Sequence, residues 1–123
     1  MSKKKLFVVM ANSDPKNPEG FYAPLFQATV AAAMSHEVEV VFTGSSGELA
    51  VKGKADEVEL NIETHRTMYD VIKEAHRVGV VFKVCTPSLK LWGEDLIDEI
   101  DETVGAAYVV AEAMEDDTVT FTY

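Results

Sequence analysis

The only cysteine of the chain, Cys85, occupies a position at which a thiol could do chemistry. It ends the apolar run Val80–Cys85 and is followed at once by Thr86, Pro87 and Ser88, a sequence typical of a helix start. A strand that delivers its last side chain to the first turn of a helix places that side chain where a thiolate would be stabilised. Thiol chemistry is therefore the first function to consider.

The elements that would position this cysteine follow from the apolar pattern along the chain. We expect strands at 6–11, 37–43, 80–85 and 118–121, a short strand or edge at 103–104, helices at 21–34, 67–78 and 105–114, and short helices at 48–51 and from 86 to about 92. Residues 52–63 are polar and favour no single structure. The order predicts one α/β domain over residues 1–123, a three-layer α/β/α sandwich around a mostly parallel, roughly five-stranded sheet.

Short polar side chains follow the first three strands of this sheet. Asn12 and Ser13 come after the first strand, Thr43 ends the second, and Thr86 follows Cys85 directly. Because ligands of open α/β sheets gather beyond the carboxyl ends of the strands, we expect these side chains to lie on one rim. They are the candidate pocket residues around Cys85.

Lys83 is a conditional member of the same site. On a regular strand, residues two apart share a face, which would put Lys83 on the side of Cys85, although its side chain could also turn away from the pocket. The alternative interpretation of the whole arrangement is that Cys85 is a small buried hydrophobic residue, as most lone cysteines in cytosolic domains are. The local sequence leaves both open.

Composition excludes several classes of function. The formal net charge of −10 argues against direct nucleic-acid binding, because phosphate backbones are recognised by concentrated Lys and Arg. No apolar run approaches the roughly 20 residues that a bilayer-spanning helix needs, and the N-terminal sequence does not have the form of a signal peptide. With one cysteine and no export signal, we expect the protein in a reducing cytoplasm.

Other motifs carry little chemistry. The three histidines are far apart and no Cys or His pair has zinc spacing, so we expect no metal. His36 and His76 are predicted surface residues; a surface position is favoured for His65 too, with a place beside the pocket left open as the alternative. A nucleophile elbow, a dinucleotide fingerprint and a P-loop are all absent, and we expect no cofactor. The acid-rich segment 94–102 is interpreted as a solvated helix face.

The order of elements, the sequence VGVVFKVCTPSLKLWG at 78–93 and the late helix followed by DTVTF at 117–121 resemble the DsrE/DsrF-like family, which includes the DsrEFH and TusD-like sulfur-relay proteins. The resemblance spans nearly the whole chain and rests on a pattern of spacing around one cysteine. It implies an α/β sulfur-relay protein in which Cys85 carries sulfur as a persulfide. A second cysteine, found in some relatives, is absent, which argues against an internal two-thiol relay.

The resemblance also implies partners. It predicts a sulfur carrier or sulfurtransferase component that takes sulfane sulfur from a donor protein, passes it to an acceptor of the TusA type, and forms a homo-oligomer, a trimer or hexamer, without any cofactor. The acidic surface would suit docking of a basic carrier. The competing hypothesis is a non-catalytic oligomeric binding or scaffolding subunit in which Cys85 is structural.

Overall fold

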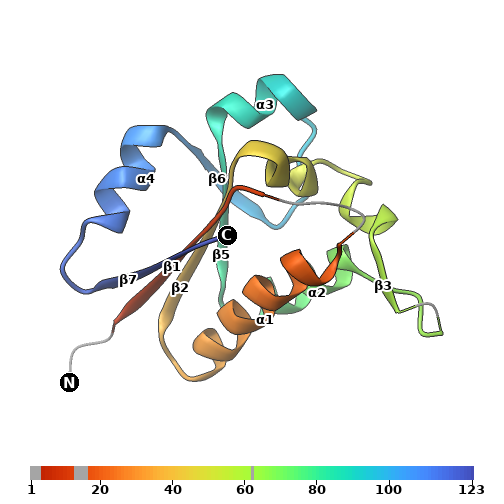
Figure 1. Ribbon diagram of the computed structural model, residues 1–123, viewed down its shortest axis with the longest axis horizontal. Helices are drawn as coiled ribbons and strands as arrows, with labels where there is room; N and C mark the ends of the chain where they lie inside the picture. Colours follow the sequence, from red (N-terminus) through yellow and green to blue (C-terminus); the bar gives the residue numbers. More distant parts are fainter. Residues whose placement is uncertain (1–3, 13–16, 62) are drawn as a thin grey trace.

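A five-stranded parallel sheet forms the centre of the computed structural model, which describes residues 4–12, 17–61 and 63–123 (Figure 1). The strand order is β6-β5-β2-β1-β7, and every neighbouring pair is parallel. The strands are β1 (Lys5–Met10), β2 (Glu37–Phe42), β5 (Val81–Cys85), β6 (Ile100–Val104) and β7 (Thr118–Thr122). The sheet is therefore open, with β6 and β7 at its edges.

Helices cover both faces of this sheet. They are α1 (Glu19–Ala33), α2 (Met68–Arg77), α3 (Thr86–Trp92) and α4 (Ala106–Ala113). The first two pack on one face in the larger core, and α4 packs on the other, so the three-layer α/β/α prediction is confirmed (Figure 1). Within the described ranges, no helix is long and apolar enough to cross a membrane.

Continuous apolar runs make the central strands because their side chains are buried alternately on opposite faces. In β1, Val8 belongs to the core under α1 and α2, and its neighbour Phe7 belongs to the smaller core under α4. Both side chains are fully buried. This double burial fixes the register of the sheet, since a shift by one residue would exchange the two sets of side chains.

Helix α2 begins where the sequence predicts it. Thr67 is its N-cap: the Thr67 side chain accepts a hydrogen bond from the backbone N–H of Asp70, and the Asp70 carboxylate accepts one from the backbone N–H of Thr67. This reciprocal capping box satisfies two N–H groups that a helix start leaves unpaired. It also holds the pKa of Asp70 below its usual value, chiefly through the bond from the Thr67 backbone.

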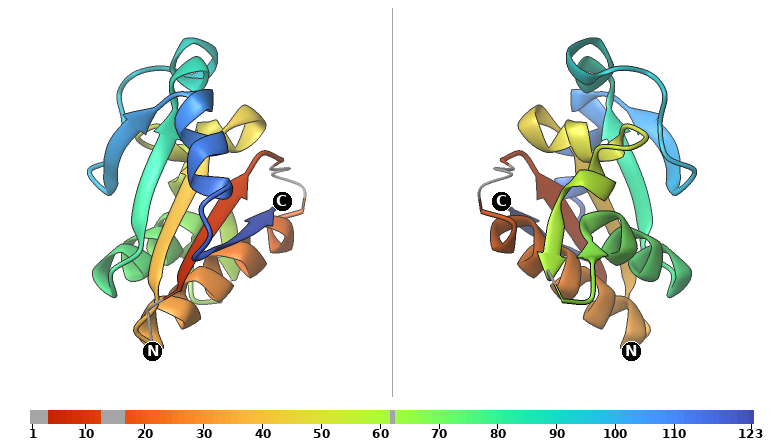
Figure 2. Two further views of the ribbon diagram at one scale, coloured as in Figure 1. Left: turned by 90° about the vertical axis from the view of Figure 1, so that its left-hand side faces the viewer. Right: turned by 90° about the vertical axis from the view of Figure 1, so that its right-hand side faces the viewer.

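The segment for which the sequence favours no structure is largely ordered. It contains the short 3-10 helix η2 (Ala55–Glu57) and the strand β3 (Glu59–Asn61). Strand β3 forms an antiparallel pair, separate from the main sheet, with β4 (Arg66–Thr67), which lies just after the segment. Figure 2 shows this pair beside α2. A further 3-10 helix, η1 (Gly44–Ala50), covers most of the short helix predicted at 48–51 and begins earlier, at Gly44.

The prediction of a solvated helix face at 94–102 is wrong. Residues 98–99 form a turn, and the edge strand β6 begins at Ile100. Where the register of β5 and β6 shifts, the Asp101 carboxylate accepts a hydrogen bond from the backbone N–H of Phe82 at 3.0 Å and lies 3.1 Å from Nε2 of His76. The acids are abundant here because an edge strand exposes most of its side chains, a pattern that resembles a polar helix in composition.

Candidate functional site

The parallel sheet brings the carboxyl ends of its strands to one edge. The backbone N–H of Thr43, just after β2, donates to the carbonyl of Met10 at the end of β1 at 2.9 Å, and Ser45 N–H donates to the Ala11 carbonyl at 3.1 Å. Gly44 between them has a φ of 55°, and a Cβ there would lie 2.7 Å from the Ala11 oxygen. The loops after β1 and β2 are thus joined through their backbones at the rim.

Cys85 is the last residue of β5 and the N-cap residue of α3. It pairs with Val104 of β6, which belongs to the smaller core under α4, and therefore lies on that face of the sheet. Its thiol is free, and the residue is 5% exposed. The predicted position at a strand end beside a helix start is present, and the residue there is buried.

Helix α3 is attached to the elements on both sides of β5. The Thr86 hydroxyl donates to the Val104 carbonyl of β6 at 3.0 Å, and the Trp92 indole N–H donates to the Gly44 carbonyl of η1 at 3.0 Å. Thr86 is the first helical residue, as predicted, and Cys85 holds the N-cap position without a side-chain capping bond. The Thr86 hydroxyl is engaged by the neighbouring strand.

The contact between α3 and η1 depends on Gly47. A Cβ at this position would lie 2.5 Å from the Ser88 Cβ and 3.2 Å from Cδ1 of Trp92, closer than atoms can pack. We expect Gly47→Ala to lower the free energy of unfolding by about 1–3 kcal/mol, because α3 must shift away from η1. Gly105→Ala is the control for steric contact, since a Cβ there meets nothing within 4 Å. Because Gly105 is the N-cap of α4, its replacement should cost about 0.5–1 kcal/mol through the weaker cap alone. Denaturant unfolding measures both, and equal stabilities would contradict the tight contact.

The other predicted pocket residues lie at unequal distances along the rim. Thr43 follows β2, the strand next to β5, and is partly buried. Asn12 follows β1, one strand further away; it is exposed, and its backbone N–H donates to the Tyr123 carbonyl beyond β7. Ser13 lies outside the described residues. The topology therefore places Thr43 and Thr86 on the elements adjoining Cys85, and Asn12 nearer to β7.

Lys83 lies on the same face of β5 as Cys85, beneath α4, but its charge is bound elsewhere. Its Nζ is 2.8 Å from Oε1 of Glu39, donates to the Tyr108 hydroxyl at 2.6 Å, and is 3.4 Å from Oε2 of Glu102. The side chain is 12% exposed. The ammonium group is thus committed to a buried ionic network rather than presented to the thiol.

Glu39 is the centre of this network. Its carboxylate also binds Nζ of Lys5 at 2.6 Å and accepts a hydrogen bond from Tyr108 at 2.6 Å, and Lys5 binds Glu112 of α4 at 2.6 Å. Burial alone would raise the pKa of Glu39, but the bonds from Lys5, Lys83 and Tyr108 outweigh it and lower the pKa. Burial likewise opposes the charge of Lys83, and the bonds to Glu39 and Tyr108 raise its pKa. Glu39 and Lys83 are therefore stabilised in their charged forms although Glu39 is buried and Lys83 is mostly buried.

Glu39 and Tyr108 were not among the site residues predicted from the sequence. A signal was present, since Glu39 interrupts an apolar strand and lysines stand in the two other strands, β1 and β5. Phe7 and Val81 are the residues in register with Glu39, so Lys5 and Lys83 lie two positions away on the same face. Recognising the network requires the strand order β5-β2-β1, which the pattern of each single strand does not contain.

The histidines lie apart from the thiol. His65 is 83% exposed in the turn between β3 and β4, where Nδ1 is 3.2 Å from a Glu59 carboxylate oxygen, so the structure does not place it beside Cys85. His36 is exposed after α1, and His76 on α2 pairs with Asp101. In the part of the chain that the structure describes, no group of three His, Cys, Asp or Glu residues is placed to hold a metal ion.

Comparisons with known proteins point to one family and one fold. A family model described as the DsrE/DsrF-like family matches residues 4–121. Among solved structures, the ychN protein from E. coli is similar with 19% identity and a TM-score of 0.66, covering 98% of this chain and 100% of that one. A conserved protein of unknown function, BT1422 from Bacteroides thetaiotaomicron, has 12% identity and a TM-score of 0.65, with coverage of 98% and 95%. No curated protein matches the chain.

Proposed function

Because this chain belongs to the DsrE/DsrF-like family, we propose that it is a cytoplasmic sulfur carrier or sulfurtransferase component that holds sulfane sulfur as a persulfide on Cys85. The observation that carries the proposal is the position of this single cysteine, at the carboxyl end of β5 and the start of α3. Ligands of open parallel sheets collect at this edge. The protein would act as a homo-oligomer, a trimer or hexamer, together with donor and acceptor proteins.

The proposed reaction is an exchange between sulfur atoms. The Cys85 thiolate attacks the outer sulfur of a donor persulfide; a new S–S bond forms at Cys85, the donor S–S bond breaks, and the donor leaves as a thiolate. An acceptor thiolate then attacks the outer sulfur of the Cys85 persulfide, and Cys85 leaves as a thiolate. The two steps balance without an external oxidant or reductant.

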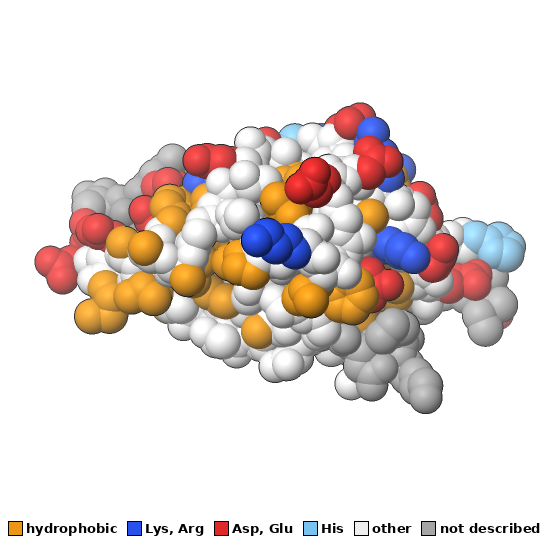
Figure 3. All heavy atoms as spheres, turned by 90° about the horizontal axis from the view of Figure 1, so that it is seen from above, with side chains coloured by type: hydrophobic (Ala, Val, Ile, Leu, Met, Phe, Trp, Pro, Cys, Tyr) orange, Lys and Arg blue, Asp and Glu red, His pale blue; other side chains and the backbone are white. Residues whose placement is uncertain are grey.

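The surface around the rim supports docking of a protein partner. Leu91 and Trp92 on α3 are 68% and 38% exposed, and Val110 on α4 is 62% exposed. Figure 3 shows apolar side chains in a band across this end of the molecule, with acidic side chains around them and some basic side chains among them. An apolar centre in a protein of net charge −10 would suit a carrier that presents its cysteine on a basic surface, of the TusA type.

The decisive experiment is to incubate the protein with polysulfide, or with a donor protein in persulfide form, and to weigh it intact. We expect the wild type to gain the mass of one sulfur atom and Cys85→Ser to gain none, because the chain has no other thiol. Ser is the matched control because it keeps the size of the side chain and removes the sulfur. Absence of sulfur on the wild type, or the same gain on Cys85→Ser, would contradict the proposal.

A second candidate is a non-catalytic binding or scaffolding subunit in which Cys85 is structural. The 5% exposure of Cys85 favours it, since a sealed thiol behaves as a small apolar side chain. The two candidates differ in a native-state property, the accessibility of the thiol to a reagent. The mass experiment separates them directly, because a structural cysteine accepts no sulfur while the protein stays folded.

A further inference from the structure

Helix α1 is apolar on the side that faces away from the core. Its inner side is buried through Phe21, Leu25 and Ala28. Its outer side carries Phe26 and Val30, which are 52% and 42% exposed, and Met34 at the end of the helix is 64% exposed. A helix that is apolar all round is ordinarily covered on every side.

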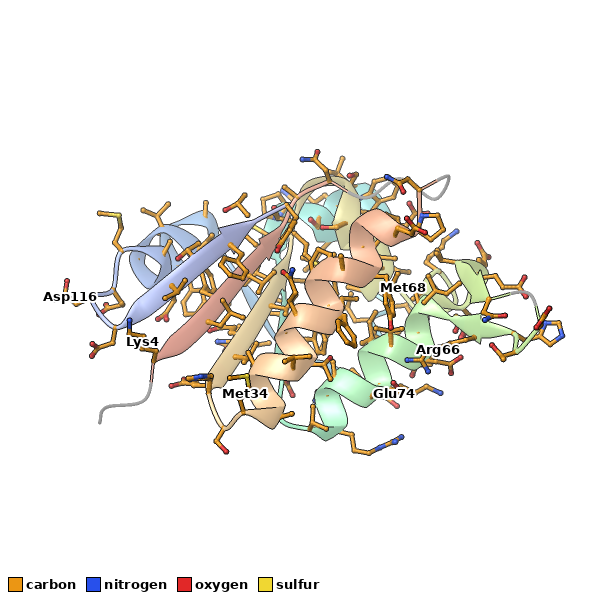
Figure 4. The ribbon with its side chains drawn as sticks, turned by 60° about the horizontal axis from the view of Figure 1, so that its bottom comes forward. Lys4, Met34, Arg66, Met68, Glu74 and Asp116 are labelled. Atoms are coloured by element: carbon orange, nitrogen blue, oxygen red, sulfur yellow. The ribbon has the colours of Figure 1, made fainter. Side chains whose placement is uncertain are left out.

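Strand β7 extends this apolar surface across the edge of the sheet. Val119 and Phe121 are in register with Leu6 and Val8 of β1, which pack under α1, so they lie on the α1 side of the sheet. They are 42% and 38% exposed. A groove of about 200 Å³ between α1 and β7 is lined by residues that include Leu6, Ala31 and Val119. We call these surfaces together the α1/β7 face; Figure 4 looks onto it and labels Met34 at one end.

The backbone of β7 is also unpaired on its outer side. In the described ranges, β7 pairs with β1 only, and it is the last strand of the sheet. Its sequence, TVTFT, contains no charge, proline or glycine, the features with which proteins usually protect an edge strand. An uncharged strand of this kind can pair antiparallel with a second copy of itself, which would set Val119 opposite Phe121.

The distribution of charge indicates which partner covers the α1/β7 face. With a net charge of −10, two copies of the chain repel one another wherever their acidic surfaces meet. No charged side chain occurs in residues 20–35 or 118–123, and the charged residues that line the groove are Lys4 and Lys5, of which Lys5 is paired with Glu39 and Glu112. Two copies can therefore meet through this face without opposing acidic side chains. A basic partner, in contrast, would be drawn to the acidic surface elsewhere. We propose that a second copy of this chain covers the α1/β7 face.

The proposal identifies the surface through which the homo-oligomer of the proposed function forms. It rests on the homo-oligomer and does not depend on persulfide chemistry at Cys85. Light scattering measures the oligomer: the wild type should have a mass that is a multiple of 13.5 kDa. Val30→Glu, which places two charges at the centre of a two-fold contact, should lower that mass. Phe26→Glu serves as a second variant if Val30→Glu fails to fold, as judged by circular dichroism. Met114→Glu is the control, because Met114 is 77% exposed outside the face and its variant should keep the wild-type mass.

A monomeric wild type would overturn the proposal and assign the face to a different protein. Dissociation by Met114→Glu, or an unchanged mass for folded Val30→Glu and Phe26→Glu, would also overturn it, because the contact would then lie elsewhere. None of these measurements depends on whether Cys85 carries sulfur. A failure here is therefore distinguishable from a failure of the Cys85 persulfide, which the intact mass of Cys85→Ser tests.

Discussion

Glu39→Gln is expected to lower the free energy of unfolding by about 3 kcal/mol, because removing one member of a buried ionic network leaves the others uncompensated. Glu39 binds both Lys5 and Lys83, and its side chain is only 4% exposed. Lys83 would keep its hydrogen bond to the Tyr108 hydroxyl, but its remaining ion pair would be the longer 3.4 Å contact with Glu102, which is 61% exposed. Chemical denaturation at neutral pH measures the loss.

The matched control is Glu112→Gln on α4. Glu112 binds Lys5 at the same 2.6 Å distance as Glu39 does, but its side chain is 26% exposed, so solvent replaces part of the lost interaction. We expect a loss of about 1 kcal/mol or less. Equal losses for the two variants would show that burial of Glu39 does not decide its contribution to stability.

The same network predicts how stability depends on pH. The pKa of Glu39 is lowered from its usual 4.5, so its contribution is fully present above pH 4.5 and is lost as the pH falls through the folded-state pKa. The pKa values of Lys5 and Lys83 are raised, so their contributions are present below pH 10.5 and are lost only above it. Below pH 4.5 the wild type should therefore lose stability more steeply than Glu39→Gln. Parallel curves would contradict the assignment.

The sequence was sufficient for the fold where burial acts on both faces of a strand. The runs that became β1, β2 and β5 are apolar because the sheet is covered on both sides, and that pattern is visible in each strand separately. A short strand or edge was predicted at 103–104, where β6 ends, but the first residues of β6 were assigned to a helix face because their exposed acids have no such constraint. Whether a segment is a helix or a strand was predictable where burial in the core determines its sequence pattern. It was uncertain where most side chains are exposed to solvent.

The candidate site divides in the same way. The position of Cys85 could be predicted because it depends on a local transition from strand to helix. Its 5% exposure and the capture of Lys83 by Glu39 could not, because both depend on side chains from other strands and from α4. The attachment of α3 through Gly47 and Trp92 is likewise a contact between segments that are far apart in sequence.

Native Cys85 is expected to react with iodoacetamide far more slowly than the same cysteine in the unfolded chain. Because the residue is only 5% exposed, we expect alkylation to require local opening at the junction of β5 and α3. The same opening would precede sulfur transfer to Cys85, which makes it the conformational step of the proposed relay. Labelling followed by mass spectrometry, with and without denaturant, measures the ratio of rates.

The attachment of α3 should control this opening. Trp92→Phe keeps an aromatic ring and removes the hydrogen bond from the indole to the Gly44 carbonyl, at a cost of about 1 kcal/mol. If α3 detaches before Cys85 becomes accessible, native labelling should be about fivefold faster in this variant. Gly105→Ala, which meets no neighbouring atom, should leave the rate unchanged. Native labelling as fast as in the unfolded chain would contradict a sealed thiol. An unchanged rate in Trp92→Phe would mean that Cys85 becomes accessible by a motion that leaves α3 attached to η1.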